Sequence, residues 1–464
     1  MPPDIEPRPY PPDTLGMSAE EMRRLGHAVV DLVVDRHARR HQEPAVLNAA
    51  LVDLVQQLGG PVPQAGGDID DAIRLLTEVA LAHQQHGDHP RYFARVPGPS
   101  SFAAVLGDWL ATGFNAIAAS WAGGSGPSAV ELIVVDWLRQ LLGFPAGAEG
   151  VLVSGGSLAN LTAIAAARAA CGPGIAYLTD QAHSCIARDL RSLGFPEEAI
   201  RIIPSDDAFR MRIADAAALV QADRAAGGRP MLLIATAGTT NTGAVDPLSE
   251  LADFCVENGL WFHIDGAYGA PAALTEPGRR LLSGIERADS LVVDPHKWLF
   301  QPYDIGCVLV RRPGALERAF TMNPEYLRDV QSSDTGEVDF RNRGLELTRR
   351  SRAIKLWLTF RAYGVQRMAA AIARGIELAE IAEQCIREQP ATWELVTPAQ
   401  LGIVTFARRG AAKSVHDAAA QSLTDSGFAT VTSTMLKSRS VLRLCTINPL
   451  TTPDDLRETL RRLA

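Results

Sequence analysis

The stretch Ser290–Arg311 constrains the fold of this 464-residue chain more than any other. An apolar run at 291–293 ends at Asp-Pro-His, a lysine follows at Lys297, and a second apolar run covers Ile305–Val310. Short apolar runs bounded by turn residues are typical of buried strands. We therefore predict two buried strands joined by a short turn that presents Lys297. Burial would lower the pKa of this lysine and free its lone pair to attack a carbonyl.

Other predicted strands also end in residues suited to binding a ligand. Their ends carry a Ser-Gly-Gly-Ser turn at 154–157, His183, the Gly-Thr-Thr turn at 238–240, and Asp265. A lysine at a strand end is more often a plain surface residue, and a single histidine is more often structural. Ligands of open α/β sheets, however, bind outside the carboxyl ends of the strands. We therefore expect these residues to form one site with Lys297.

Pyridoxal phosphate (PLP) requires this combination of residues. Its aldehyde needs a lysine, its pyridinium nitrogen needs an acidic partner, and its phosphate needs the N-terminus of a helix. Lys297 and Asp265 supply the first two groups, and the turn at 154–157 precedes a predicted alanine-rich helix at 159–170. The sequence therefore predicts a PLP site.

The motifs DPHKW, DQAHS, HIDGAYG and AGTT, in their order along the chain, resemble those of the group II PLP-dependent decarboxylases. Aromatic-L-amino-acid decarboxylase and glutamate decarboxylase belong to this family, and the likeness runs from about residue 90 to residue 361. The resemblance implies an α/β fold of the fold type I PLP-dependent transferase (aspartate aminotransferase-like) class. Its large domain would hold a mostly parallel seven-stranded sheet, preceded by an N-terminal helical segment and followed by a small α+β domain.

The resemblance also implies roles for particular residues. Lys297 would form the Schiff base, Asp265 would pair with the pyridinium nitrogen, and His183 would stack on the ring and help to orient the substrate. Ala267 would touch the other face of the ring, and His296 would reach toward the phosphate. The implied cofactor-binding residues are Gly156, Ser157, His183, Thr240, Asp265, Ala267, His296 and Lys297.

The segment MNPEYL at 322–327 matches a loop that carries a tyrosine in family decarboxylases, here Tyr326. This tyrosine would protonate the carbanion left after loss of carbon dioxide, and aldehyde-forming relatives carry phenylalanine there. The resemblance thus implies decarboxylation of an L-amino acid to its amine, with Lys297, Tyr326, His183 and Asp265 as the catalytic residues. Oxidative decarboxylation to an aldehyde is one alternative. Aminotransfer, in which Arg443 would bind the substrate carboxylate unless it is only a strand-edge arginine, is another, and a protein that holds the cofactor without turnover is a third.

Two departures from the aromatic decarboxylase affect the expected site. Asp294 stands where that enzyme has asparagine, and a carboxylate beside a phosphate is unfavourable unless it is paired or turned away. Arg95, Val96 and Ala119 replace aromatic residues of its substrate pocket, to which the resemblance assigns Arg95 and Gly98. We therefore expect a substrate other than a standard catechol or indole amino acid, either bulkier or with an acidic group for Arg95. Alternatively, Arg95 points to solvent.

Composition excludes several other classes of protein. A net charge of −8 argues against nucleic acid as a partner. The six cysteines show no CxxC pairing, so we expect neither a metal site nor disulfides, and reduced thiols suit a cytoplasmic protein. The apolar stretch at 102–121 is interrupted by Asp108, which favours a buried helix pair or a dimer contact over a membrane span.

We expect three domains. Residues 1–85 would form an arm and helices that clasp the partner of a homodimer, as the resemblance implies. Residues 86–360 alternate strand and helix signals and would bind PLP. Residues 361–464 would form the small C-terminal α+β domain, with a helix at 365–388, strands near 402–407 and 441–446, and a final helix at 453–463.

Overall fold

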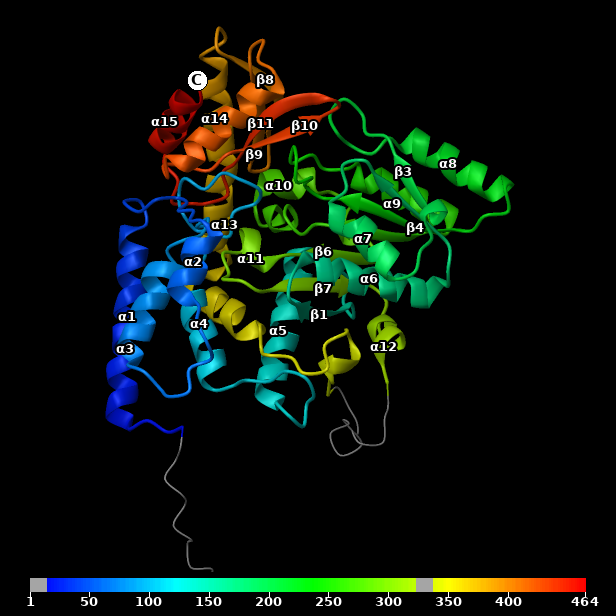
Figure 1. The fold of residues 1–464 in the computed structure, drawn as a ribbon. Helices are drawn as coiled ribbons and strands as arrows, with labels where there is room; N and C mark the ends of the chain where they lie inside the picture. The colour runs from blue at the N-terminus through cyan, green and yellow to red at the C-terminus, as the bar shows by residue number, and fades with distance from the viewer. Residues whose placement is uncertain (1–14, 323–336) are drawn as a thin grey trace, which may run out of the picture. The chain divides into compact units, whose positions relative to one another are not determined.

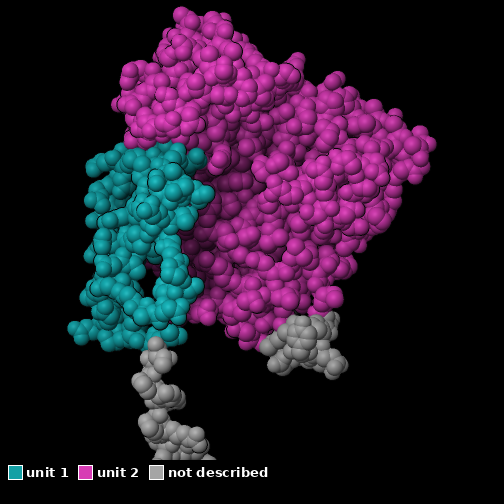
Figure 2. All heavy atoms as spheres, viewed as in Figure 1, with its two compact units in different colours: residues 1–85 teal, residues 86–464 magenta. Residues whose placement is uncertain are grey.

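The computed structural model describes residues 15–322 and 337–464. The chain divides into two compact units, Met1–Gln85 and His86–Ala464, which Figure 2 distinguishes by colour. Tyr326 lies outside the described residues. The expected boundary at residue 360 falls shortly before Gly364, where the backbone of α13 (Ala353–Arg387) leaves the helical conformation, and the separate C-terminal domain stays a prediction.

The first unit is helical. Its elements are α1 (Ala19–Arg39), α2 (Leu51–Leu58), α3 (Ile69–Leu75) and the π-helical turn η1 (Leu76–Ala80). The first helix is capped by Ser18, whose hydroxyl accepts a hydrogen bond from the amide of Glu21 at 3.1 Å. Among the apolar residues of α1, Leu25 is buried, whereas Val29 and Leu32 remain 38% and 42% exposed.

A seven-stranded sheet forms the centre of the second unit (Figure 1). Its strands are β1 (Glu149–Val153), β2 (Ile175–Thr179), β3 (Ile200–Ile203), β4 (Pro230–Thr236), β5 (Trp261–Asp265), β6 (Ser290–Val293) and β7 (Gly306–Val310). The order is β1-β7-β6-β5-β4-β2-β3, and only β7 runs antiparallel to its neighbours. Most strands are buried along their whole length, which explains their continuous apolar runs. The predicted mostly parallel sheet is confirmed.

Helices cover both faces of this sheet. On one face lie α6 (Gly156–Cys171), α7 (Ser184–Ser192) and α12 (Ala315–Phe320); on the other lie α5 (Ser125–Leu141), α8 (Ile213–Ala225) and α9 (Leu248–Asn258). Successive residues of a strand face opposite sides. Accordingly, Val151 and Val153 pack in the core beneath α6, whereas Leu152 packs in the core with α5. The shorter elements α10 (Glu276–Leu281) and η3 (Ala270–Leu274) follow β5.

The last part of the chain is an α+β arrangement, as predicted. After α13 come β8 (Trp393–Gln400), β9 (Ile403–Arg408), α14 (Lys413–Asp425), β10 (Thr432–Leu436), β11 (Arg439–Cys445) and α15 (Pro453–Leu463). The antiparallel sheet has the order β10-β11-β9-β8. The predicted strands correspond to β9 and β11, the final helix matches the predicted bounds, and β8 and β10 were missed. α13 kinks at Gly364, whose φ is 68°.

Helix α4 (Phe102–Gly113) covers only part of the apolar stretch at 102–121. Within residues 15–322 and 337–464, none of the helices combines the length and the apolar character that crossing a membrane requires.

Candidate active site

A cavity of about 380 Å³ opens at the carboxyl ends of the parallel strands. Its walls come from the segments that follow β1, β2, β4, β5 and β6. All the cofactor-binding residues expected from the sequence line it: Gly156, Ser157, His183, Thr240, Asp265, Ala267, His296 and Lys297. The fold therefore brings together residues that lie up to 141 positions apart (297 − 156).

Lys297 lies on a helical turn, α11 (Pro295–Trp298), between β6 and β7, rather than on the simple turn that the sequence predicted. Its Nζ lies 2.9 Å from Oδ2 of Asp294. Burial alone would lower the pKa of Lys297, but the carboxylates of Asp294 and Asp265 outweigh it, so its pKa lies above that of an ordinary lysine. Without the cofactor, the amine of Lys297 is therefore a cation paired with Asp294. The prediction that the pKa of Lys297 is lowered overall is wrong.

Asp265 ends β5 and is 6% exposed. Its Oδ1 accepts a hydrogen bond from the amide of Ala267 at 3.1 Å. Burial raises the pKa of Asp265, although the charge of Lys297 opposes this effect. His183 immediately precedes α7, where its Nδ1 accepts from the amide of Cys185 at 3.3 Å. Burial lowers the pKa of His183, so its ring faces the cavity in the neutral form.

The turn before α6 leaves room for an anion at the start of the helix. No side chain of the described residues caps this helix, and its first residues line the cavity, so their amide groups are available to an anion there. A Cβ at Gly155 would lie 3.0 Å from Cε1 of His296, and one at Gly156 would lie 2.6 Å from Oδ2 of Asp294. Glycine at both positions therefore permits this close approach of the two chain segments.

His296 is held by the loop that leads into β7. The amide of Ile305 donates to its Nδ1 at 3.3 Å. Burial lowers the pKa of His296, so the ring is neutral and carries its proton on Nε2. That nitrogen lies 3.6 Å from Oδ2 of Asp294.

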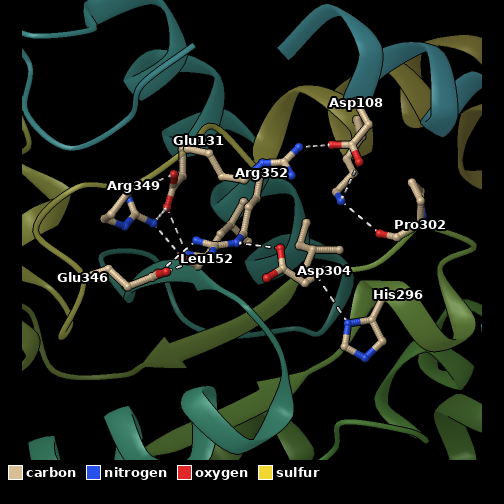
Figure 3. Close-up of polar contacts among 12 residues, drawn as sticks. Asp108, Glu131, Leu152, His296, Pro302, Asp304, Glu346, Arg349 and Arg352 are labelled. Atoms are coloured by element: carbon tan, nitrogen blue, oxygen red, sulfur yellow. Dashed lines mark hydrogen bonds and ion pairs between the residues drawn. The ribbon is translucent and has the colours of Figure 1, made fainter. Parts of the chain in front are cut away.

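The loop 299–305, which carries this amide, is fastened by residues at the start of α13 (Figure 3). Arg352 Nε donates to Asp304 Oδ1 at 3.1 Å, and the buried Lys355 donates to the carbonyl of Pro302 at 2.9 Å. α13 thereby fixes the loop that orients His296.

Two buried side-chain groups of the cavity wall escaped sequence reasoning. The ring of Tyr268 stacks on Trp298 with centroids 5.2 Å apart, and its hydroxyl accepts from the amide of Gly402 at 2.8 Å. Asn160 bonds Nε2 of His263 at 2.8 Å, and burial lowers the pKa of this histidine to about 3. Tyr268 and His263 belong to the motif around Asp265, but the residues that they bond, Gly402 and Asn160, lie far away in the sequence.

Of the expected substrate-binding residues, His183 lines this cavity, whereas Arg95 and Gly98 lie outside its wall. Arg95 is exposed, and its carbonyl accepts from Nη1 of Arg443. Gly98 is buried, and a Cβ there would lie 2.5 Å from the hydroxyl of Tyr303. Arg443 belongs to β11, which pairs on both sides, so it is not a strand-edge arginine.

These residues fit pyridoxal phosphate. Lys297 offers the amine, Asp265 offers a buried carboxyl at the end of β5, and the start of α6 offers the amide groups for a phosphate. When bound, PLP supplies a conjugated ring that withdraws electrons from the substrate.

Comparisons with known proteins agree with this geometry. Residues 53–409 match the pyridoxal-dependent decarboxylase conserved domain. The chain is 42% identical to aromatic-L-amino-acid decarboxylase of Bacillus atrophaeus, over 97% of this chain and 96% of that protein. Among solved structures it resembles Catharanthus roseus tryptophan decarboxylase in complex with L-tryptophan, with a TM-score of 0.89, 30% identity, and coverage of 96% and 98%. It also resembles Rhodiola rosea 4-hydroxyphenylacetaldehyde synthase, with a TM-score of 0.88, 25% identity and the same coverage. The chain belongs to the pyridoxal-dependent decarboxylase family and is a PLP-dependent carboxy-lyase that acts on an amino acid.

Proposed function

We propose that this enzyme decarboxylates an aromatic L-amino acid to the corresponding amine and carbon dioxide. The observation that carries the proposal is the convergence of Lys297, Asp265 and His183 on one cavity. The aromatic class is supported by the Bacillus atrophaeus relative and by the tryptophan decarboxylase structure. The small residues Val96 and Ala119, at positions where the aromatic decarboxylase has aromatic ones, further favour an aromatic substrate with a bulkier ring, in which case catechol and indole amino acids would be poorer substrates. The acidic group expected for Arg95 gains no support from the cavity, because Arg95 is exposed and lies outside its wall.

Each residue would contribute a separate effect. Asp265 would hold a proton at the pyridinium nitrogen, for which its buried position provides a strong interaction. His183 would stack on the ring as a neutral imidazole and orient the substrate. Lys297 would bind the cofactor covalently and exchange it for the substrate amine, and Tyr326 would return a proton to Cα.

A substrate panel tests the reaction. The purified enzyme is incubated with the proteinogenic amino acids, dopa, 5-hydroxytryptophan and larger or acidic ring analogues, while carbon dioxide and amine are measured. Release of both from an aromatic member is expected, whereas release from a non-aromatic amino acid alone would refute the aromatic class.

Lys297→Ala should abolish turnover, and borohydride should fix PLP to the peptide that contains Lys297 in the unaltered enzyme. Lys413→Ala is the matched control, because Lys413 is 59% exposed on α14. Substantial activity of Lys297→Ala would contradict the role of this lysine.

The non-oxidative outcome is proposed from Tyr326. The unaltered enzyme should release one amine per carbon dioxide without consuming oxygen, and Tyr326→Phe should divert product toward the aldehyde. The likeness to an aldehyde synthase makes this the main alternative. Aldehyde from the unaltered enzyme, or amine alone from Tyr326→Phe at an unchanged rate, would contradict the assignment.

We also propose a cytoplasmic homodimer in which the first unit clasps its partner. Large apolar side chains remain exposed on this unit, among them Leu51 (77%), Val52 (72%), Val55 (59%) and Leu76 (54%). The six cysteines are free, which suits a reducing compartment. Light scattering should give twice the chain mass, and Val52→Lys should yield monomer while Val256→Lys, at another exposed valine, should not. A fully active monomer would refute the homodimer.

A further inference from the structure

Asp294 places a carboxylate in the part of the cavity assigned to the phosphate. It follows β6, its side chain is 2% exposed, and it lies between two glycines of neighbouring segments. A Cβ at Gly156 would lie 2.6 Å from its Oδ2, and one at Gly306 would lie 2.8 Å from its Oδ1. Asp294 therefore lies directly against the first residue of α6.

The two oxygens of this carboxylate have different surroundings. Oδ2 pairs with Nζ of Lys297 at 2.9 Å and lies 3.6 Å from Nε2 of His296. Oδ1 is buried and has no hydrogen-bond partner among the residues that the structure describes. A buried oxygen without a partner is unfavourable, so a bound group that satisfies it would gain stability.

The charges around Asp294 come from several elements. The titratable groups that face it are Lys297 and His296 on α11, Asp265 on β5, His183 before α7, Tyr303 after α11, and Cys307 on β7. Burial lowers the pKa of both histidines, so both are neutral. Lys297 is therefore the cation that balances Asp294 within this described set.

Cofactor binding changes this balance. When Lys297 joins the aldehyde, a C=N bond forms, the C=O bond breaks and water leaves. The nitrogen of Lys297 carries one positive charge before the reaction, and it carries one afterwards if the C=N group is protonated. This step would then need no proton from solvent. The phosphate, however, brings a charge of about −1.5 to −2. Two buried anions would then share one region without an added cation, which is costly.

We propose that Asp294 and the cofactor phosphate share one proton, so that each cofactor bound brings one proton from solvent to this pair. The shared proton forms a hydrogen bond between a carboxylate oxygen and a phosphate oxygen, which replaces repulsion between two anions. Asp294 is thus a phosphate-positioning residue that couples cofactor loading to pH. This inference rests on the proposed assignment of the phosphate to Gly156 and Ser157.

The test measures cofactor binding, without substrate, in the full chain stripped of PLP. Calorimetric titration in two buffers of different ionisation enthalpy gives the number of protons taken up. The unaltered protein should take up about one proton more than Asp294→Asn at alkaline pH. Its Kd for PLP should accordingly rise with pH about tenfold more steeply per unit than that of Asp294→Asn.

Two controls isolate the effect. Pyridoxal, which lacks the phosphate but reacts with the same lysine, is titrated into both proteins and should not show the extra proton of the unaltered protein. Asp253→Asn removes a surface carboxylate that pairs with Arg287 and should behave as the unaltered protein does. Asp294→Asn also removes a partner of Lys297, so the difference that pyridoxal shows between the two proteins measures the change at Lys297. This difference is subtracted from the one that PLP shows, both for proton uptake and for the pH slope.

Equal proton uptake and equal pH slopes in the unaltered protein and Asp294→Asn, after subtraction of the pyridoxal difference, would overturn the inference. Weaker binding by Asp294→Asn at every pH with a parallel slope would also overturn it, because Asp294 would then act only as the partner of Lys297. Failure of borohydride to fix PLP at Lys297 would instead refute the proposed cofactor site, so the two failures are distinguishable.

Discussion

Arg349 and Glu131 form an ion pair with an Nη2–Oε1 distance of 2.7 Å, and their side chains are only 2% and 0% exposed. The same Oε1 accepts from the amide of Leu152 at 2.9 Å, and Arg349 donates to the carbonyls of Leu152 and Ala118 (Figure 3). Leu152 lies in β1, shortly before the turn at 154–157. The pair therefore fixes the end of the strand from which the proposed phosphate turn begins.

Glu131→Gln should lower the free energy of unfolding by about 3–5 kcal/mol, because it leaves the charge of Arg349 buried without its partner. Urea denaturation measures this loss. The matched control is Glu394→Gln, since Glu394 and Arg439 form a pair with side chains 38% and 45% exposed, where a change below about 1 kcal/mol is expected. Equal losses in both variants would show that burial of the pair carries no special cost.

The sequence predicts the strand ends of this site well, because each apolar run is followed at once by a residue with recognisable chemistry. Lys297, Asp265 and His183 were found in this way. The sequence did not predict contacts between distant residues, such as Asn160 with His263, 103 positions apart, or Tyr268 with Gly402, 134 positions apart. It also predicted a lowered pKa for Lys297, because burial is visible in an apolar run whereas the distance to Asp294 is not.

Gly98→Ala should raise KM on the order of fivefold, which corresponds to about 1 kcal/mol. A Cβ there would lie 2.5 Å from the hydroxyl of Tyr303, so the tyrosine must move. Tyr303 is 62% exposed and packs against His296 with ring centroids 5.1 Å apart, so it can move at little cost in stability. On a Tyr303→Ala background the substitution should have no added effect on KM. An undiminished effect there would show that Gly98 acts independently of Tyr303.

Tyr268→Phe should lower the free energy of unfolding by about 1–3 kcal/mol, because the buried amide of Gly402 loses its acceptor. The stack on Trp298 is retained in this variant, so the effect isolates the hydroxyl. Hydrogen exchange should show faster exchange at Gly402, and urea denaturation should show the loss. Tyr363→Phe on α13, where the ring is only half-buried, is the control. Unchanged exchange at Gly402 would contradict the role of this hydrogen bond.

Asp189→Asn should stabilise the protein increasingly as the pH rises. Asp189 is 4% exposed on α7, and Oδ2 has no hydrogen-bond partner among the described residues. Burial, assisted by the charge of Asp265, raises its pKa to about 7, although Arg188 opposes this effect. The folded state therefore binds more protons than the unfolded state between about pH 4 and pH 7, so this carboxyl costs more stability as the pH rises through that range.

The advantage of Asp189→Asn should accordingly grow by about 2 kcal/mol between pH 5.5 and pH 8.5, because most of the remaining ionisation of the folded form occurs near pH 7. Urea denaturation at the two pH values measures it. Asp207→Asn provides the contrast, since Lys437 lowers the pKa of that exposed carboxyl and no growing advantage is expected. A gain in the free energy of unfolding that is the same at both pH values would contradict the raised pKa, because it would show that the Asp189 carboxyl is already ionised at pH 5.5.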